Sequence, residues 1–394
     1  MISINKVIKL KELAIARITE QESNLYELSL RIHSNPELGF NERKAAGWLT
    51  EYLFKNGFSV DKGACGMPTA FIASYGSGSP MVAFLAEYDA LPEIGHACGH
   101  NLIAIAAIGA AAAVKQVIDH CGGTVFVIGT PAEELIGGKV KMAEEGTFNR
   151  FDAAMMVHPG TYDTATITAL AAVALEVEFI GREAHASAHP EEGINALDAM
   201  ILAFSAINKL KEKIGKNERI HGIITDGGRA ANIIPARSAA NFLVRAENED
   251  ALDRLKRKAL NCFTRASKQV GARLNYKWGD SAYAPMRNNT ALASLFIDNM
   301  KQLGYQMPLS DEREKFGSTD MGNVSQVIPV IHPMISITDE TVTVHSFEFA
   351  SAAASERGFK ATIRAAKALA MTAIDLFAIP ENITRSKQEF LNSF

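Results

Sequence analysis

The chain has 394 residues and a formal net charge of −4. With 47% hydrophobic and 21% charged residues, the composition is typical of a globular protein of two or three domains. It lacks the excess of positive charge by which nucleic-acid-binding and anionic-membrane-binding surfaces are recognised, so we expect neither partner.

Three features favour a cytoplasmic protein with reduced thiols. The first 21 residues lack the apolar core of a signal peptide. The longest apolar stretch, 102–114, has 13 residues, fewer than the roughly 20 that span a bilayer, so we expect a buried helix there. Four cysteines are too few for a disulfide framework.

The first part of the chain predicts helices followed by buried strands. Residues 20–60 have helical periodicity with one break at HSNPELGF, residues 33–40. Four apolar runs follow, TAFIASY, MVAFLAEY, TVFVIGT and DAAMMVHP, and helical stretches alternate with the last three. Continuous apolar strands separated by helices predict an α/β fold with a mostly parallel sheet sandwiched by helices.

The pattern changes near residue 170. In VALEVEFIG, apolar residues alternate with Glu176 and Glu178, as in a strand with one wet face. A helix (194–214), two strands (219–226 and 238–246), a charged amphipathic helix (248–270) and a strand (272–280) are predicted to follow. The order β-α-β-β-α-β is that of a ferredoxin-like α+β domain.

After residue 284 the buried α/β pattern returns. Residues 292–304 predict a helix, VIPVIHPMISI (327–337) predicts one apolar strand, and residues 347–377 predict one long Ala-rich helix. We therefore expect a discontinuous catalytic domain, 1–169 and 286–394, with a separate domain, 170–285, inserted into it.

Acids and histidines follow four of the strands predicted for the first domain. Each of these four strands is followed by one or two such residues. They are Asp89, the adjacent Glu133 and Glu134, His158 and His345. Because ligands of open α/β sheets bind beyond the carboxyl ends of the strands, we expect these side chains to meet at one edge.

The segment HACGHN adds two further candidates. Cys98 and His100 are two residues apart, so in extended backbone both would point to the same side, and Gly99 would allow close backbone approach. Asn101 is the predicted N-cap of the Ala-rich helix, whose N-terminus would favour a Cys98 thiolate. Thiolate, imidazole and carboxylate suit zinc or a similar divalent metal.

Each residue alone has an ordinary structural explanation. A lone buried cysteine behaves as a small hydrophobe, and paired surface glutamates are usually solvated. Glu133 and Glu134, however, directly follow a buried strand, where two adjacent carboxylates need a counter-charge. The agreement of four segments favours a metal site over the separate explanations.

Eight motifs between about residues 33 and 350 resemble one known family. They are HSNPELGFNE, EYDALPEIGHACGHN, GTPAEELIGGK, VHPG, GREAHASAHPEEGINALDA, NIIPARSAANFLVRA, GSTDMGNVS and TVHSFEF. Together they resemble the M20 family of metallopeptidases and amidohydrolases, and within it the aminoacylase-like branch that includes p-aminobenzoyl-glutamate hydrolase and β-alanyl-lysine-type dipeptidases.

The resemblance implies a role for each matching residue of the metal site. It implies that Glu133 is the general base, and that Asp89 orients a ligand histidine through a hydrogen bond. It also implies two divalent metal ions per subunit, zinc or manganese. The implied ligands are Cys98, His100, Glu134, His158 and His345.

Further candidates come from other motifs. His185 is the candidate donor to the oxyanion, and Asn232 is the predicted contact to the substrate carboxylate or carbonyl. Arg245 is a further substrate candidate, for which a strand-edge charge in water is an equally good explanation. Ser318 and Asp320 resemble a family loop near the substrate, but they are equally compatible with an ordinary turn.

The resemblance also implies a homodimer paired through the inserted domain, which would act as lid and dimerisation surface, with His185 serving the partner's active site. One departure is the pair Leu135 and Ile136, which stands where many relatives have Gly-rich sequence. We expect these side chains to narrow the pocket.

The sequence therefore predicts a di-metal amidohydrolase that cleaves an amide in a dipeptide or acyl-amino acid, with water activated by Glu133. An N-acyl-amino-acid deacylase is the alternative within this class. A thiol hydrolase with Cys98 as nucleophile and His100 as base would leave the other acids and histidines without a role. A non-catalytic metal-stabilised binding protein is possible on the same fold, but the presence of Glu133 argues against it.

Overall fold

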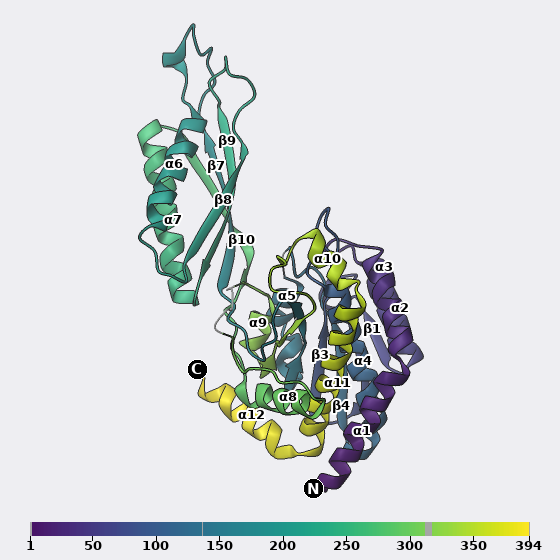
Figure 1. Cartoon of the computed structure of the whole chain (residues 1–394). Helices are drawn as coiled ribbons and strands as arrows, with labels where there is room; N and C mark the ends of the chain where they lie inside the picture. The colour runs from purple at the N-terminus through teal and green to yellow at the C-terminus, as the bar shows by residue number, and fades with distance from the viewer. Residues whose placement is uncertain (1, 136, 312–316, 394) are drawn as a thin grey trace. The chain divides into compact units, whose positions relative to one another are not determined.

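The computed structural model describes residues 2–135, 137–311 and 317–393, which fall into two compact units (Figure 1). The described residues of unit 1 are 2–135, 137–167, 287–311 and 323–393, and those of unit 2 are 168–286 and 317–322. Unlike in the predicted division, segment 317–322 groups with unit 2, where the Leu170 N–H donates to the Gly317 carbonyl at 2.8 Å.

Unit 1 contains a six-stranded sheet of order β1-β2-β4-β3-β5-β11. Its strands are β1 (Ser59–Lys62), β2 (Phe71–Ser77), β3 (Met81–Ala86), β4 (Gly123–Gly129), β5 (Ala153–Met155) and β11 (Val330–Ile331). The pairs β4–β3, β3–β5 and β5–β11 are parallel, whereas the pairs β1–β2 and β2–β4 are antiparallel. Every residue of β4 is buried, as expected for a sheet covered on both faces. The prediction of a mostly parallel sheet with helices is confirmed.

The helices of unit 1 surround an Ala-rich centre. They are α1 (Ile4–Glu20), α2 (Glu22–His33), α3 (Arg43–Lys55), α4 (His100–Cys121), α5 (Gly138–Glu144), α8 (Thr290–Gln302), α10 (Phe347–Ala353), α11 (Glu356–Ala378) and α12 (Pro380–Asn392); the short α9 (Met321–Ser325) crosses the boundary between the units. Helix α4 packs against α1, α2, α3 and α11 and against the strands β2, β3, β4 and β6 (His158–Gly160). Among the described residues α4 alone is long and apolar enough to cross a membrane, yet 89% of its most apolar stretch is buried inside the protein.

Two elements predicted as continuous are interrupted. The apolar run 327–337 gives β11 and β12 (Met334–Ser336), separated at His332 and Pro333, and β12 pairs with β6 (His158–Gly160) in a separate two-stranded sheet. The predicted helix 347–377 divides into α10 and α11 because the Ser355 hydroxyl caps α11 by accepting from the Gly358 N–H at 3.0 Å.

Unit 2 has the element order that the sequence predicts. Its elements are β7 (Ala171–Ile180), α6 (Ala196–Lys211), β8 (Arg219–Asp226), β9 (Arg237–Ala246), α7 (Glu249–Val270) and β10 (Arg273–Tyr283). The four strands form an antiparallel sheet of order β10-β7-β9-β8. The apolar side of β7 packs in a core with α6 and α7. That this unit acts as a lid or dimerisation surface stays a prediction.

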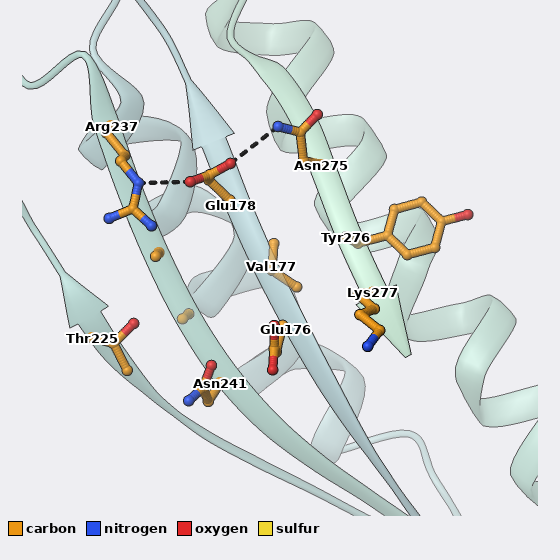
Figure 2. A pocket seen from close by; sticks show the side chains of 11 residues that line it. Glu176, Val177, Glu178, Thr225, Arg237, Asn241, Asn275, Tyr276 and Lys277 are labelled. Carbon is orange, nitrogen blue, oxygen red and sulfur yellow. Dashed lines mark hydrogen bonds and ion pairs between the residues drawn. The ribbon is translucent and has the colours of Figure 1, made fainter. Parts of the chain in front are cut away.

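The opposite face of the unit 2 sheet is polar and carries a groove (Figure 2). Near one end of the groove, the Glu178 carboxylate accepts hydrogen bonds from Arg237 Nε at 2.6 Å and Asn275 Nδ2 at 3.0 Å. These two hydrogen bonds hold the pKa of Glu178 below its usual value. Glu178 is therefore paired within its own sheet.

A buried ion pair joins three helices in the core of unit 1. Lys11 of α1 donates to Asp375 of α11 at 2.7 Å and to Asn299 of α8 at 2.8 Å. Lys11→Met would leave the Asp375 charge buried without a cation, so we expect a loss of about 3–5 kcal/mol in the free energy of unfolding, measured with urea. Lys55→Met, which breaks an exposed pair with Glu51, is the control and should have no measurable effect. Equal results for both variants would contradict the prediction.

Candidate metal centre

The predicted ligands and the predicted base gather at one edge of the unit 1 sheet. Their side-chain donor atoms form three overlapping groups, in each of which all atoms lie within 4.8 Å of one another. The groups are Cys98–His100–His158, Cys98–Glu134–His345 and His100–Glu133–Glu134. Cys98, His100 and Glu134 each belong to two groups. The parallel strands explain this meeting, because β3, β4, β5 and β11 point their carboxyl ends to the same edge.

Asp89, three residues beyond the end of β3, connects two of these residues. Its Oδ1 accepts from His100 Nδ1 at 2.9 Å, and its Oδ2 accepts from the Glu134 N–H at 3.0 Å. Burial opposes the negative charge, but His100 and these hydrogen bonds hold the pKa of Asp89 below its usual value. Because Nδ1 of His100 is engaged, its Nε2 is the nitrogen available to the donor groups.

Cys98 and His158 face each other, with 3.5 Å between Sγ and Nε2. His158 Nδ1 donates to the Pro159 carbonyl at 2.7 Å, which leaves Nε2 as the acceptor or ligand atom. Burial and the nearby Glu134 raise the pKa of the Cys98 thiol well above its usual value. The helix N-terminus is therefore insufficient to ionise Cys98, and thiolate formation would need a cation at the site.

The start of α4 differs in one respect from the prediction. Gly99 is the N-cap, with φ at +78°, and a Cβ there would lie 2.8 Å from Pro159 Cγ, so glycine is required as expected. The prediction that Asn101 caps the helix is wrong. Its buried amide donates to Ser29 Oγ and to the Ala353 carbonyl, both at 2.9 Å.

Glu134 and His345 form the third side of the cluster. His345 Nε2 lies 3.4 Å from Glu134 Oε1. His345 has a left-handed backbone, with φ at +64°, and its N–H donates to the Ala97 carbonyl at 3.0 Å. Although burial raises the pKa of Glu134, His345 and His100 hold it below its usual value.

The donor set fits divalent cations. His100 Nε2 and Glu134 Oε1 are buried and have no hydrogen-bond partner among the described residues. Buried polar atoms without partners are uncommon, and both of these point into the donor groups. Imidazole, carboxylate and thiolate are the ligands that zinc takes in proteins. A cation would satisfy both orphaned atoms at once.

Three buried residues near the cluster were not predicted from the sequence. Lys139 of α5 donates to Glu87 Oε1 at 2.5 Å, and both side chains are fully buried. Glu87 Oε2 lies 3.4 Å from His100 Nε2. The ring of His332 lies 5.3 Å from that of His158, and burial together with His158 keeps its pKa well below the usual value. Glu87 could have been found, since it lies two residues before Asp89.

Two of the predicted residues of unit 2 come together. The Ala186 N–H donates to the Asn232 carbonyl at 3.0 Å, which holds the segment after His185 beside Asn232. The N–H groups of Ser187 and Ala188 donate to His185 Nδ1 at 3.4 and 3.2 Å. In this exposed ring, Nδ1 is therefore the acceptor and Nε2 carries the N–H.

The other predicted substrate contacts lie elsewhere in unit 2. Arg245 is near the carboxyl end of β9, whereas Asn232 precedes the start of that strand, so the structure does not bring them together. Burial lowers the pKa of Arg245. Ser318 and Asp320 belong to the segment 317–322, in which Asp320 is fully buried.

Of the apolar pair Leu135 and Ile136, which departs from the family motif, the structure describes only Leu135. The side chain of Leu135, which directly follows Glu133 and Glu134, is 55% exposed. Ile136 lies outside the described residues. The prediction that both side chains narrow the pocket therefore stays a prediction.

The chain belongs to the peptidase family M20/M25/M40, whose family model it matches over residues 83–369, and it is a hydrolase. It is 38% identical to the Xaa-Arg dipeptidase of Mus musculus, over 97% of this chain and 92% of that protein. It is also 38% identical to one of the polypeptides of the p-aminobenzoyl-glutamate hydrolase of Escherichia coli, over 56% of this chain and 50% of that polypeptide. These findings confirm the predicted family.

Solved structures share the fold. The YXEP protein of Bacillus subtilis, described as a dinuclear metal binding peptidase of the M20 family, matches with a TM-score of 0.66 at 20% identity, over 91% of this chain and 99% of that chain. The fold assignment thus agrees with the family assignment.

Asp89→Asn tests the geometry of the cluster. An amide cannot accept both from His100 and from the Glu134 N–H without turning a donor toward one of them, so zinc affinity should fall by about 10–100-fold. Competition with a fluorescent zinc chelator measures this. Asp152→Asn is the control, because Asp152 accepts from the Met81 N–H at 2.6 Å at the other end of β3. Unchanged zinc affinity in Asp89→Asn would refute the role of Asp89.

Proposed function

We propose that the protein is a di-metal-dependent amidohydrolase that cleaves an amide bond in a dipeptide or an acyl-amino acid. The observation that carries the proposal is the sharing of Cys98 between two donor groups, with Glu133 in a third group beside them. Two ions held close together, next to a carboxylate, are an arrangement suited to hydrolysis.

The proposed ligands of the two ions are Cys98, His100, Glu134, His158 and His345, and the proposed metal is zinc or manganese. The orphaned atoms of His100 and Glu134 and the description of the Bacillus subtilis protein as dinuclear metal binding support two ions per subunit. When bound, such ions supply Lewis acidity toward an amide carbonyl and toward water.

The chain's own residues would move the protons and hold the substrate. Glu133 would take a proton from water and return it to the leaving amine, while Asp89 keeps His100 and Glu134 oriented. His185 Nε2, protonated because Nδ1 accepts, would donate to the oxyanion. Asn232 would bind the substrate carboxylate or carbonyl.

Three further substrate contacts are proposed from the family resemblance alone. They are Arg245, Ser318 and Asp320. Arg245 carries a guanidinium that suits a substrate carboxylate, and Ser318 and Asp320 offer a hydroxyl and a carboxylate for hydrogen bonds.

Dipeptides are the favoured substrate class, because the full-length relative at 38% identity is an Xaa-Arg dipeptidase. The test is a panel of dipeptides, N-acyl amino acids and p-aminobenzoyl-glutamate, each with zinc, manganese or cobalt. We expect metal-dependent cleavage of dipeptides. Cleavage restricted to N-acyl amino acids would instead identify a deacylase, and metal binding without any cleavage would favour a binding protein.

A thiol hydrolase with Cys98 as nucleophile is disfavoured. Such an enzyme needs a thiol of lowered pKa, whereas burial and Glu134 raise the pKa of Cys98. Activity that survives chelation but is lost on alkylation would reverse this preference.

We further propose a cytoplasmic homodimer in which unit 2 acts as lid and dimerisation surface. The strand β8 lies at an edge of its sheet, and Ile223 and Ile224 on it are 65% and 42% exposed. An exposed apolar edge strand is a liability unless another strand pairs with it. Pairing of two β8 edges would give the two-fold dimer that is commonest among oligomers.

The division of roles between the paired glutamates gives a sharp test. Glu133→Ala should abolish turnover and leave metal content near that of the wild type, because the base is removed but the ligands remain. Glu134→Ala should lose both. Elemental analysis of the two purified variants, beside turnover of the best dipeptide, checks this. Equal loss of metal in both would overturn the assignment.

Mixed dimers test the role of His185 across subunits. Dimers reassembled from Glu133→Ala and His185→Ala subunits, each inactive alone, should be about half mixed if pairing is random. One site of each mixed dimer would combine an intact Glu133 with the neighbour's intact His185, so activity should return to roughly a quarter of wild type. If verified mixed dimers stay inactive, His185 acts within its own chain or has no catalytic role.

A further inference from the structure

The turn that carries Glu133 and Glu134 is held in an unusual conformation. Ala132, just before the pair, has a left-handed backbone with φ at +60°, which is unfavourable for a residue with a Cβ. Such strain persists only where the surroundings enforce it. The turn closes on itself through the Gly137 N–H, which donates to the Ala132 carbonyl at 2.9 Å, and the Gly138 N–H, which donates to the Pro131 carbonyl at 3.1 Å.

A buried carboxylate from a distant segment fastens this turn. Glu42 Oε1 accepts from the Ala132 N–H at 2.8 Å, and Glu42 is fully buried. Its Oε2 accepts from the Thr69 hydroxyl at 2.9 Å. The Thr69 carbonyl in turn accepts from the Tyr88 hydroxyl at 2.6 Å. Tyr88 directly precedes Asp89. Glu42 therefore connects the glutamate turn to the segment that positions His100.

Glu42 does not cap the helix that it precedes. It is the N-cap residue of α3, but its side chain makes no capping hydrogen bond. Instead the Glu37 carboxylate accepts from the Lys44 and Ala45 N–H groups at the start of α3. The cap is thus supplied by Glu37, and Glu42 is left for Ala132.

The segment just before Glu42 also packs against the turn that carries Glu133 and Glu134. A Cβ on Gly39 would lie 2.7 Å from Ala132 Cβ, and 2.9 Å from both Ala132 Cα and Leu135 Cδ1. Only glycine therefore fits at position 39 without displacing the turn. This contact gives a purpose to the motif HSNPELGFNE, which the proposed reaction does not otherwise use.

We propose that Glu42 is a positioning residue that, together with the space left by Gly39, fixes the turn on which Glu133 and Glu134 reach the metal site. The proposal rests on the roles given above to those two glutamates. Glu42 acts through the backbone of Ala132, and what it supplies is a hydrogen-bond acceptor.

The first experiment compares Glu42→Gln with Glu42→Leu. Glutamine keeps an acceptor for the Ala132 N–H, and the Thr69 hydroxyl can accept from its amide, so zinc affinity and kcat should stay within about threefold of wild type, since the hydrogen bonds persist. Leucine leaves the N–H unpaired, so zinc affinity should fall by about 10–100-fold. We expect kcat on the best dipeptide to fall by a similar factor, about 10–100-fold, with KM changed less.

The second experiment displaces the turn without changing any charge. Gly39→Ala should weaken zinc binding and lower kcat by about tenfold or more, because its Cβ pushes on Ala132. Gly47→Ala in α3 is the matched control, since a Cβ there meets nothing within 4 Å. Competition with a fluorescent zinc chelator and thermal unfolding of the chelated protein accompany the kinetics of every variant.

The outcomes are separable. Wild-type zinc affinity and kcat in Glu42→Leu, or losses in Glu42→Gln as large as in Glu42→Leu, would overturn the inference. If Glu42→Leu does not fold, wild-type behaviour of Gly39→Ala overturns it equally. If the wild-type protein binds no metal and cleaves no substrate, the proposed function itself is wrong. The variants test the role of Glu42 only against a wild type that binds zinc.

Discussion

The two hydrogen bonds of Asp89 are the interaction on which the geometry of the candidate metal centre depends. One carboxylate accepts from a side chain at the start of α4 and from the backbone after β4. It therefore sets the ring of His100 and the backbone of Glu134 relative to each other. Because the two neighbouring strands β3 and β4 are parallel, these segments leave the sheet at the same edge, and one short side chain can reach both.

Charge is the second constraint on this region. Glu87, Asp89, Glu133 and Glu134 lie within or beside one buried cluster, and burying a carboxylate without a counter-charge is costly. Lys139 neutralises Glu87 within the protein. Cations at the donor groups would be the natural counter-charge for the rest, and the acids around Cys98 have the oxygen atoms that could bind them.

Much of the fold was predictable because hydrophobic periodicity is a local property. The alternation in β7 and the acidic start and basic middle of α7 mark these elements without knowledge of their neighbours. The division at Ser355 was not predictable, since the Ala-rich sequence continues on both sides of it. The change at His332 and Pro333 was missed for a related reason, because an apolar run does not show which sheet each half joins.

The sequence by itself determined the kinds of donor atoms and the strand ends at which they stand, because order along a parallel strand fixes the edge at which each side chain leaves the sheet. Only the tertiary structure decided which atoms meet. Lys139 against Glu87, Glu42 against the Ala132 N–H, and Gly39 beneath the same turn join residues 52, 90 and 93 positions apart. Such contacts depend on how the loops pack over the sheet, and local patterns along one chain carry no signal of that packing.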